Sequence, residues 1–594
     1  MKFIQVLKKI HWHYWFILLI AILFFVAVSS FNYFTQHFDS QNSNKEFVKW
    51  LSPDETANYI FTKLYAQEGR LTIFEKYNLY VHDIMHPRSF RSDLGVLKPV
   101  SFLGIILIFG KIASLFSYKI IPFLTPLFAS IGLFFYYLLV KELFGRFNAL
   151  LSVFLLSFFP VYVYYSARSM FHNILFVVLL VVGFYFLVII NKERSKVKIC
   201  KSYIDIKKYI ITALAGLFIG LAVTVRTSEL FWLAPILLLI YFFNIRKTNI
   251  VQIIIFLFFV FLAFLPVIQY NQILYGCPYY GGYTEMNYSL DNIKEASSKL
   301  IKINNSLPFS RRIDLIYKIK NSLFPFGIDL NKSFKMFCYY FVDMFPFLFW
   351  GGVLGLVIFF KNPFKHQKKH FVFLLVYLIF SYLLILYYGS WDFHDNPDHS
   401  QHTIGNSYTR YWLPIYLGAI PFASLFLEHL TKKIIKIFSC QHNTFRNKLN
   451  SKLLAPAFLV AVISLIVFNF ITFVLWGSDE GLIYSVQKQN EARREFKRVM
   501  NLTENNAVII TFYHDKLFFP QRKVVVGLFN DKNMVAQYAV LAKYLPVYYY
   551  NFTLPPEAIN YLNERRLKEV GLQIEQISRI NYDFTLYKLN LVEK

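Results

Sequence analysis

Apolar residues along the chain gather into runs long enough to cross a bilayer, separated by shorter polar segments. The first run extends from about 12 to 30 and follows a short N-terminus that carries Lys2, Lys8 and Lys9. Its length fits a retained span better than a cleaved signal peptide. The pattern predicts a polytopic α-helical membrane protein with twelve candidate spans. The other eleven lie near 101–117, 121–140, 147–165, 174–190, 210–225, 230–243, 251–269, 341–360, 370–388, 411–429 and 454–475.

Basic residues indicate which candidates cross, because cytoplasmic loops are enriched in Lys and Arg. If 101–117 crosses, three basic loops, 191–208, 361–369 and 432–452, lie outside. If it does not cross, every basic loop lies inside. We therefore expect about eleven transmembrane helices, with the N-terminus cytoplasmic, long outer loops at 31–120 and 270–340, and the C-terminal tail outside. The 101–117 helix would then lie on the outer face or re-enter it, and a twelve-span topology is the alternative.

The tail beyond about residue 477 has a different pattern, charged and without a run long enough to span. Short strand-like runs alternate with helical periodicity, which predicts a small extracytoplasmic α/β domain. We therefore expect a transmembrane domain over 1–475 and an α/β domain over 476–594. The expected elements are helix 486–500, strand 507–512, strand 523–528, helix 534–544, strand 547–552, helix 556–570 and strand 584–589.

Composition supports the membrane class. Hydrophobic residues make up 56% of the 594 and charged residues 16%, whereas soluble domains carry roughly 25% charged residues. The net charge of +27 does not indicate nucleic-acid binding, because basic loops of membrane proteins explain it. The four cysteines form no CxxC pair. Two of them, Cys277 and Cys338, share the second long outer loop, where an oxidising compartment permits a disulfide.

Polar residues with catalytic potential occur at the start of the first outer loop. The adjacent acids Asp54 and Glu55 follow Ser52. One of them could act as general base for an acceptor. The pattern alone favours a helix N-cap, formed by Ser52 or Asp54 with Glu55 in the first turn. Later in the loop, the segment 86–89 (His-Pro-Arg-Ser) and Lys98 could hold an anionic headgroup or form a solvated turn.

Arginines recur at the predicted outer ends of other spans. Arg168 could reach a lipid phosphate or anchor the helix at the interface. Arg226 stands three residues before Glu229, which also allows a local ion pair. Arg410, followed by Tyr411, lies at a helix mouth, where a cation needs a partner such as phosphate unless it snorkels to the interface.

A cluster of histidines and aspartates precedes the tenth span. Three His and three Asp fall within the twelve residues 391–402, which gives ligand chemistry for a divalent ion. Their spacing matches no standard zinc pattern. We therefore expect no metal cofactor, with His394, Asp395, Asp398 and His399 as the candidate ligands of the metal-dependent alternative.

The order of these motifs resembles the GT-C superfamily of integral-membrane glycosyltransferases. The resemblance is carried over about 1–475 by the acids at 54–55 with Tyr59, the segment 86–89, the outer helix, the inner turn 141–146, Tyr165-Ser166-x-Arg168 and Arg410-Tyr411. It is nearest to the bacterial and archaeal branch that includes protein O-mannosyltransferases and the lipid A aminoarabinose transferase (family 39-like). It implies a multi-pass protein of a prokaryotic plasma membrane.

The resemblance implies a hexosyl- or pentosyltransferase. Such an enzyme moves a sugar from a polyprenyl phosphate to a protein, lipid or glycan at the outer face. The implied catalytic residues are Asp54, as base, and Glu55 beside it. The implied donor-phosphate ligands are Arg168, Arg410, Lys98 and Arg226, which would stabilise the departing phosphate. The implied substrate-binding residues are Tyr59, His86, Arg88, His172, Asn173 and Tyr411.

The chain departs from the family pattern in the second outer loop. Many relatives carry a second acid there, where this chain has His172 and Asn173. The departure leaves activity open and favours a metal-free mechanism. Two other classes also remain open: a transporter or flippase of polyprenyl-linked sugars, which would favour inverted repeats, and a non-catalytic membrane scaffold.

Overall fold

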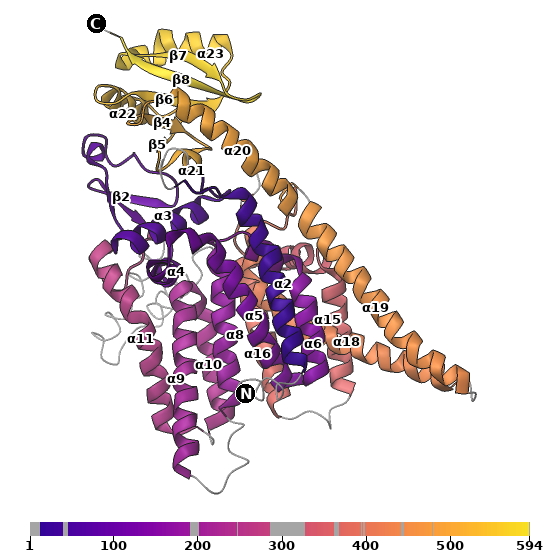
Figure 1. The fold of residues 1–594 in the computed structure, drawn as a ribbon. Coiled ribbons are helices and arrows are strands. Elements are labelled where there is room, and N and C mark those ends of the chain that lie inside the picture. The colour runs from indigo at the N-terminus through magenta and orange to yellow at the C-terminus, as the bar shows by residue number, and fades with distance from the viewer. Residues whose placement is uncertain are drawn as a thin grey trace, which may run out of the picture. The chain divides into compact units, whose positions relative to one another are not determined.

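The computed structural model describes residues 12–39, 46–190, 201–245, 248–284, 327–361, 368–393, 395, 398, 400–440, 445–477 and 479–592. The chain divides into two compact units, each built from separate segments (Figure 1). We call the first the helical unit; it comprises Met1–Ser29, Phe123–Gln269 and Thr284–Leu482. We call the second the mixed unit; it comprises Ser30–Pro122, Tyr270–Tyr283 and Ile483–Lys594.

Long apolar helices dominate the helical unit. Nine of the described helices are long and apolar enough to cross a membrane, and two bent pairs bring the number to as many as eleven. The fold is therefore polytopic and α-helical, and its nine to eleven candidate spans include the expected number of about eleven. The helices are α2 (Trp12–Thr35), α5 (Ile121–Phe144), α6 (Arg146–Phe158), α7 (Pro160–Ala167), α8 (His172–Ile189), α9 (Lys201–Val225), α10 (Leu230–Asn244), α11 (Ile250–Tyr275), α14 (Leu330–Phe337), α15 (Pro346–Lys361), α16 (Lys368–Gly389), α17 (Ser407–Tyr411), α18 (Leu413–Cys440) and α19 (Phe445–Trp476).

Two expected spans are bent. Between α6 and α7 the direction changes by 54°, because Pro160 begins α7 and Phe159 before it adopts an extended conformation. Between α14 and α15 the bend is 97°, and a π-helix, Cys338–Asp343, precedes Pro346. The second break falls at the start of the expected span 341–360, where Asp343 and Pro346 interrupt the apolar run.

Small residues allow helices of this unit to pack closely. A Cβ at Gly355 of α15 would collide with the carbonyl of Phe422 in α18. A Cβ at Gly216 of α9 would likewise collide with the carbonyl of Phe256 in α11. Close backbone approach of this kind provides van der Waals contact in a bilayer, where the hydrophobic effect does not drive helix association.

The C-terminal part of the mixed unit is an α/β domain, as predicted. Its sheet has the order β5-β4-β6-β8-β7, parallel from β5 to β6 and antiparallel from β6 to β7. Six of the seven expected elements are present, and the expected helix 556–570 is divided at 562 and 567. The elements are α20 (Leu482–Leu502), β4 (Val508–Thr511), α21 (Asp515–Phe518), β5 (Lys523–Val526), α22 (Lys532–Ala542), β6 (Val547–Phe552), α23 (Pro556–Tyr561), β7 (Leu572–Arg579) and β8 (Phe584–Leu591).

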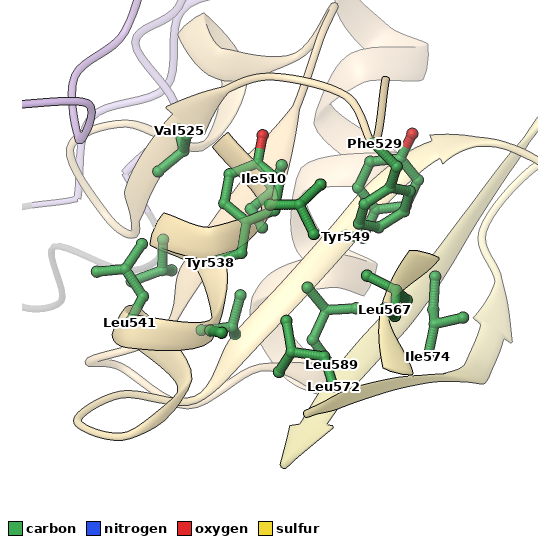
Figure 2. Packing of buried hydrophobic residues seen from close by; sticks show 14 of the residues in the cluster. Ile510, Val525, Phe529, Tyr538, Leu541, Tyr549, Leu567, Leu572, Ile574 and Leu589 are labelled. Atoms are coloured by element: carbon green, nitrogen blue, oxygen red, sulfur yellow. The ribbon is translucent and has the colours of Figure 1, made fainter. Parts of the chain in front are cut away.

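The core of this domain lies between the sheet and α22. Figure 2 shows Tyr538 and Leu541 of α22 beside strand residues such as Ile510 and Tyr549. Two residues of the first long loop, Val81 and Met85, belong to the same buried cluster. The predicted boundary at 475/476 divided the chain into two continuous domains. In the structure, the unit that contains the α/β domain also includes residues 30–122.

The loop contributes its own elements to the mixed unit. They are α3 (Pro53–Glu68), a three-stranded sheet of β1 (Ile73–Phe74), β3 (Val96–Pro99) and β2 (Phe90–Asp93), and α4 (Leu103–Leu115). At 13 residues, α4 is too short to span, which agrees with excluding 101–117 from the spans.

Cys277 and Cys338, for which a disulfide was allowed, are free thiols.

Candidate functional site

The two candidate catalytic acids occupy the first turn of α3 and differ in environment. Ser52 is the N-cap residue, and its backbone N–H donates to Glu55 Oε2 at 3.2 Å. Glu55 is fully buried. Because its carboxylate accepts this bond, Glu55 caps the helix, as the sequence pattern favoured. Asp54 is half-buried and accepts a hydrogen bond from the Ser89 hydroxyl at 2.5 Å. Of the two, Asp54 is the one whose carboxylate is not committed to the helix cap.

The segment 86–89 lies against α3 through that bond, but its arginine is occupied elsewhere. Arg88 Nε and Nη2 donate to the fully buried Asp515 at 3.0 and 2.6 Å. Its backbone N–H donates to the same carboxylate at 2.8 Å. Arg88 thus joins the loop to α21, and His86 lies beside it with Nδ1 2.9 Å from the Pro87 carbonyl oxygen. Arg88, which was predicted to bind substrate, thus connects the first long loop with the α/β domain inside the mixed unit.

Tyr59 faces a different part of α3. It is buried, with its ring 4.6 Å from that of Trp50, and burial raises the pKa of Tyr59 well above its ordinary value. The side chain lines a cavity of about 190 Å³ together with Lys49.

Lys98, a predicted phosphate ligand, lies on β3 and pairs with Asp93 at 2.9 Å. The Lys98 charge is therefore already offset within the hairpin.

Two arginines of the helical unit that are distant in sequence meet at one aromatic ring. The guanidinium carbons of Arg168 and Arg410 lie 5.1 and 4.7 Å from the centroid of Phe171. Arg168 ends α7 and donates to the Tyr164 hydroxyl at 2.8 Å. Arg410, on α17, donates to the Ser407 hydroxyl at 2.6 Å. Both arginines are predicted phosphate ligands, and the structure brings them together.

Arg226 has a partner of its own. Its guanidinium pairs with the buried Glu229 at 2.8 Å and donates to the Tyr388 hydroxyl at 3.0 Å. The Glu229 carboxylate also accepts from Tyr388 and from Trp232. The local ion pair that the spacing allowed is therefore present, and it offsets the charge predicted to bind phosphate. Arg226 remains connected to the other arginines through Tyr411, whose ring lies 4.5 Å from Arg226 and 5.1 Å from Arg410.

One of the two residues in place of a second acid, Asn173, supports this cluster. His172 and Asn173 form the first turn of α8 and are buried. The Asn173 amide donates to the backbone carbonyl of Arg410 at 3.1 Å. Asn173 thus holds α17 against α8, a function that a carboxylate could not perform because it has no N–H to donate.

No group of three or more His, Cys, Asp or Glu side chains within the described ranges is arranged to hold a metal ion. Two of the weak candidates serve local structure. Asp395 accepts from the backbone N–H of Ser407 at 2.7 Å, and Asp398 accepts from Ser400. His394 and His399 lie outside the described residues.

Phe171 and Tyr164 were not among the residues predicted for this arrangement. The one local signal for these two residues was their position in the sequence, since both lie within four residues of Arg168. Tyr388 and Ser407 could not be found in this way, because their contacts depend on how α16 and α17 pack.

The chain is similar in fold to two solved membrane proteins. The oligosaccharyltransferase of Archaeoglobus fulgidus, tethered with an acceptor peptide containing the NVT sequon, aligns with a TM-score of 0.51 and 13% identity, over 92% of this chain and 69% of that one. ArnT of Cupriavidus metallidurans, bound to undecaprenyl phosphate, aligns with a TM-score of 0.50 and 9% identity, over 97% and 98%. No family model and no curated protein sequence matches. The alignments confirm the GT-C-like fold.

Proposed function

We propose that the protein is a membrane glycosyltransferase that moves a sugar from a polyprenyl-phosphate donor to an acceptor at the outer face of the membrane. The observation that carries the proposal is the meeting of Arg168 and Arg410 on Phe171. Their helices belong to a fold similar to that of ArnT, which was solved with undecaprenyl phosphate. Guanidinium groups match the geometry of phosphate oxygens.

The proposed reaction is a direct displacement. An acceptor oxygen forms a bond to C1 of the sugar while the bond from C1 to the phosphate oxygen breaks. The polyprenyl phosphate leaves with the bonding electrons, and Arg168 and Arg410 stabilise its growing negative charge. We assign the proton of the acceptor to the Asp54 carboxylate, because Ser89 orients one oxygen of this group and Glu55 is committed to the cap.

The phosphate assignment can be tested in full-length protein in nanodiscs by measuring the binding of labelled polyprenyl phosphate. Arg168→Ala and Arg410→Ala should each weaken binding about ten- to a hundred-fold, which corresponds to the loss of charge-assisted hydrogen bonds. Arg146→Ala is the matched control, because Arg146 packs on another ring of the same unit, Trp12, at 5.0 Å. Unchanged binding in both test variants would contradict the proposal. Transfer from a panel of radiolabelled polyprenyl-phosphate sugars then identifies the donor.

We also propose a plasma-membrane topology with the N-terminus cytoplasmic and the α/β domain outside, on the distribution of basic residues. A cysteine placed by Asp531→Cys should react with an impermeant reagent added to cells. One placed by Lys196→Cys should be spared until the membrane is permeabilised. Reversed labelling would contradict the topology.

A further inference from the structure

A small cavity in the mixed unit is enclosed by segments that are far apart in the sequence. Its volume is about 190 Å³. Helix α3 contributes Tyr59 and Lys63 to its lining, the segment before α3 contributes Lys49, and the α/β domain contributes Pro520 and Gln521. All of these segments belong to the mixed unit. We call this space the Lys49 cavity.

Lys49 is held in the wall of this cavity by both its backbone and its side chain. Its backbone N–H donates to Gln36 Oε1 at 2.8 Å, and its carbonyl accepts from the amides of Gln36 and Gln489 at 2.8 and 2.9 Å. Its ammonium group donates to the Phe519 carbonyl and to Gln521 Oε1. Since Gln521 also lines the cavity, these contacts fix a buried cation beside it.

The hydrogen-bond acceptors of this ammonium group are neutral. The group also faces the ring of Phe496, whose centroid lies 5.5 Å from the nitrogen. An ammonium has three N–H groups, so it can donate one more bond beyond those to Phe519 and Gln521. The acid in the lining, Glu46, pairs with Lys63 at 3.0 Å. With Lys49 protonated, the lining therefore carries one positive charge in excess, which a monoanion would offset.

The Tyr59 hydroxyl is a second group that favours a ligand. Tyr59 is 4% exposed, and its hydroxyl has no hydrogen-bond partner within the part of the chain that the structure describes. A buried hydroxyl without a partner is costly, and native structures usually supply one from protein, ordered water or a ligand. Because Tyr59 lines the cavity, a ligand there can accept this hydrogen bond.

The remaining walls limit the size and the chemistry of the ligand. They are mostly apolar, with side chains of Val48, Ile60, Leu64, Ile73 and Pro520. An apolar cavity of about 150 Å³ holds benzene, so the Lys49 cavity has room for a molecule of about seven non-hydrogen atoms. Such walls favour a hydrocarbon group over a hydrated inorganic ion, which loses its water at a high cost.

We propose that the Lys49 cavity binds a small monocarboxylate. Its carboxylate accepts hydrogen bonds from the Lys49 ammonium group and the Tyr59 hydroxyl, and its short hydrocarbon part packs on the apolar walls. The proposal goes beyond the transferase function and does not depend on it, because the lining includes none of Asp54, Arg168 and Arg410. Tyr59, predicted to bind substrate, instead serves this additional ligand.

The test compares a carboxylate with its neutral isostere. Full-length protein in nanodiscs is titrated calorimetrically with pentanoate and with pentanamide at about pH 6.5, with empty nanodiscs as the blank. Pentanoate should bind about ten- to a hundred-fold more tightly, the equivalent of a charge-assisted hydrogen bond. Decanoate and inorganic phosphate are titrated in the same way, and both should bind more weakly than pentanoate.

Two variants remove the polar contacts one at a time. Lys49→Met should weaken pentanoate binding about ten- to a hundred-fold and leave pentanamide binding nearly unchanged. Lys488→Met, at an exposed position of α20, is the matched control and should bind both as the wild type does. Tyr59→Phe should weaken pentanoate binding about three- to ten-fold. It should fold normally, because the lost hydroxyl has no described partner in the protein.

Filling the cavity should remove binding of both probes. Leu64→Trp places a larger side chain in the lining, and Ile73→Phe serves if Leu64→Trp does not fold. Leu79→Trp, 57% exposed and outside the lining, should retain wild-type binding.

The other outcomes contradict the proposal in different ways. Undetectable pentanoate binding would mean that the cavity holds only water. Equal affinity for pentanamide, or pentanoate binding that persists in Lys49→Met or in both cavity-filling variants, overturns the proposal. Tighter binding of decanoate would indicate a site for a lipid chain, and tighter binding of phosphate a site for an inorganic anion. Unchanged pentanoate affinity in Tyr59→Phe would overturn the assignment of Tyr59.

Discussion

Arg168 and Arg410 place their guanidinium groups on the same aromatic ring, that of Phe171, although the two arginines belong to different helices. Bringing two like charges together opposes folding unless their surroundings stabilise both. The face of an aromatic ring attracts cations through its quadrupole. Hydrogen bonds from Arg168 to Tyr164 and from Arg410 to Ser407 fix the two groups further. Such a pair is preorganised for a dianionic ligand such as a phosphate monoester.

Replacing the shared ring should therefore weaken donor binding without removing a charge. Phe171→Leu should raise the KM for the polyprenyl-phosphate donor about five- to thirty-fold, the equivalent of about 1 to 2 kcal/mol of lost cation–π stabilisation, with a smaller effect on kcat. Steady-state kinetics over a range of donor concentrations measures both. Phe176→Leu is the control, since Phe176 is buried on α8, which begins directly after Phe171, and packs on Trp232. Equal KM values in the two variants would show that the ring does not position the arginines.

The two acids of α3 should respond differently to loss of charge. Asp54→Asn removes the proposed base, so the transfer rate should fall by about two to four orders of magnitude while binding of polyprenyl phosphate is retained. Glu55→Gln should change the rate less and lower the free energy of unfolding by about 1 kcal/mol, because Glu55 accepts from the cap residue. Full transferase activity in a well-expressed Asp54→Asn variant would falsify the base assignment.

The features that could be predicted from the sequence are those that depend on the residues of one short segment. The spans and most elements of the tail follow from runs of one residue class, and Ser52-x-x-Glu55 is a recognisable capping pattern. Strand β7 was missed because few of its side chains are buried, which weakens the alternation. The break before Pro346 was missed because the surrounding residues are mostly apolar, although Asp343 and the proline itself interrupt the run. The partners of Arg88 and the ring shared by Arg168 and Arg410 depend on packing between distant segments, which a single sequence does not reveal.

The ion pair of Arg226 and Glu229 provides a test of whether Arg226 binds phosphate. Glu229→Gln removes the charge that offsets Arg226 and leaves a buried cation. We expect a loss of about 3 to 5 kcal/mol of stability, seen as a lower Tm in detergent, and no tighter binding of polyprenyl phosphate. The double variant Arg226→Met/Glu229→Met should recover most of the Tm. Tighter donor binding in Glu229→Gln would instead assign Arg226 to the phosphate.

Lys49 should make the stability of the mixed unit depend on pH. The side chain is 3% exposed, and its ammonium group donates to the Phe519 carbonyl and to Gln521 Oε1. Burial lowers the pKa of Lys49 to about 7, with Glu46 opposing and Lys63 adding to the shift. Between pH 7 and about 10.5 the unfolded chain holds a proton that the folded chain has lost, so stability rises with pH in this window.

The Lys49→Met variant isolates this contribution. Because Met carries no titrating proton, the free energy of unfolding of the wild type relative to Lys49→Met should rise by up to about 1.4 kcal/mol per pH unit between pH 7 and 10. Urea unfolding of the full chain in detergent, at matched ionic strength, measures the difference. Lys488→Met, at an exposed position of α20, should give a difference independent of pH over the same range. A flat difference for Lys49→Met as well would mean that Lys49 keeps an ordinary pKa and that water reaches its ammonium group.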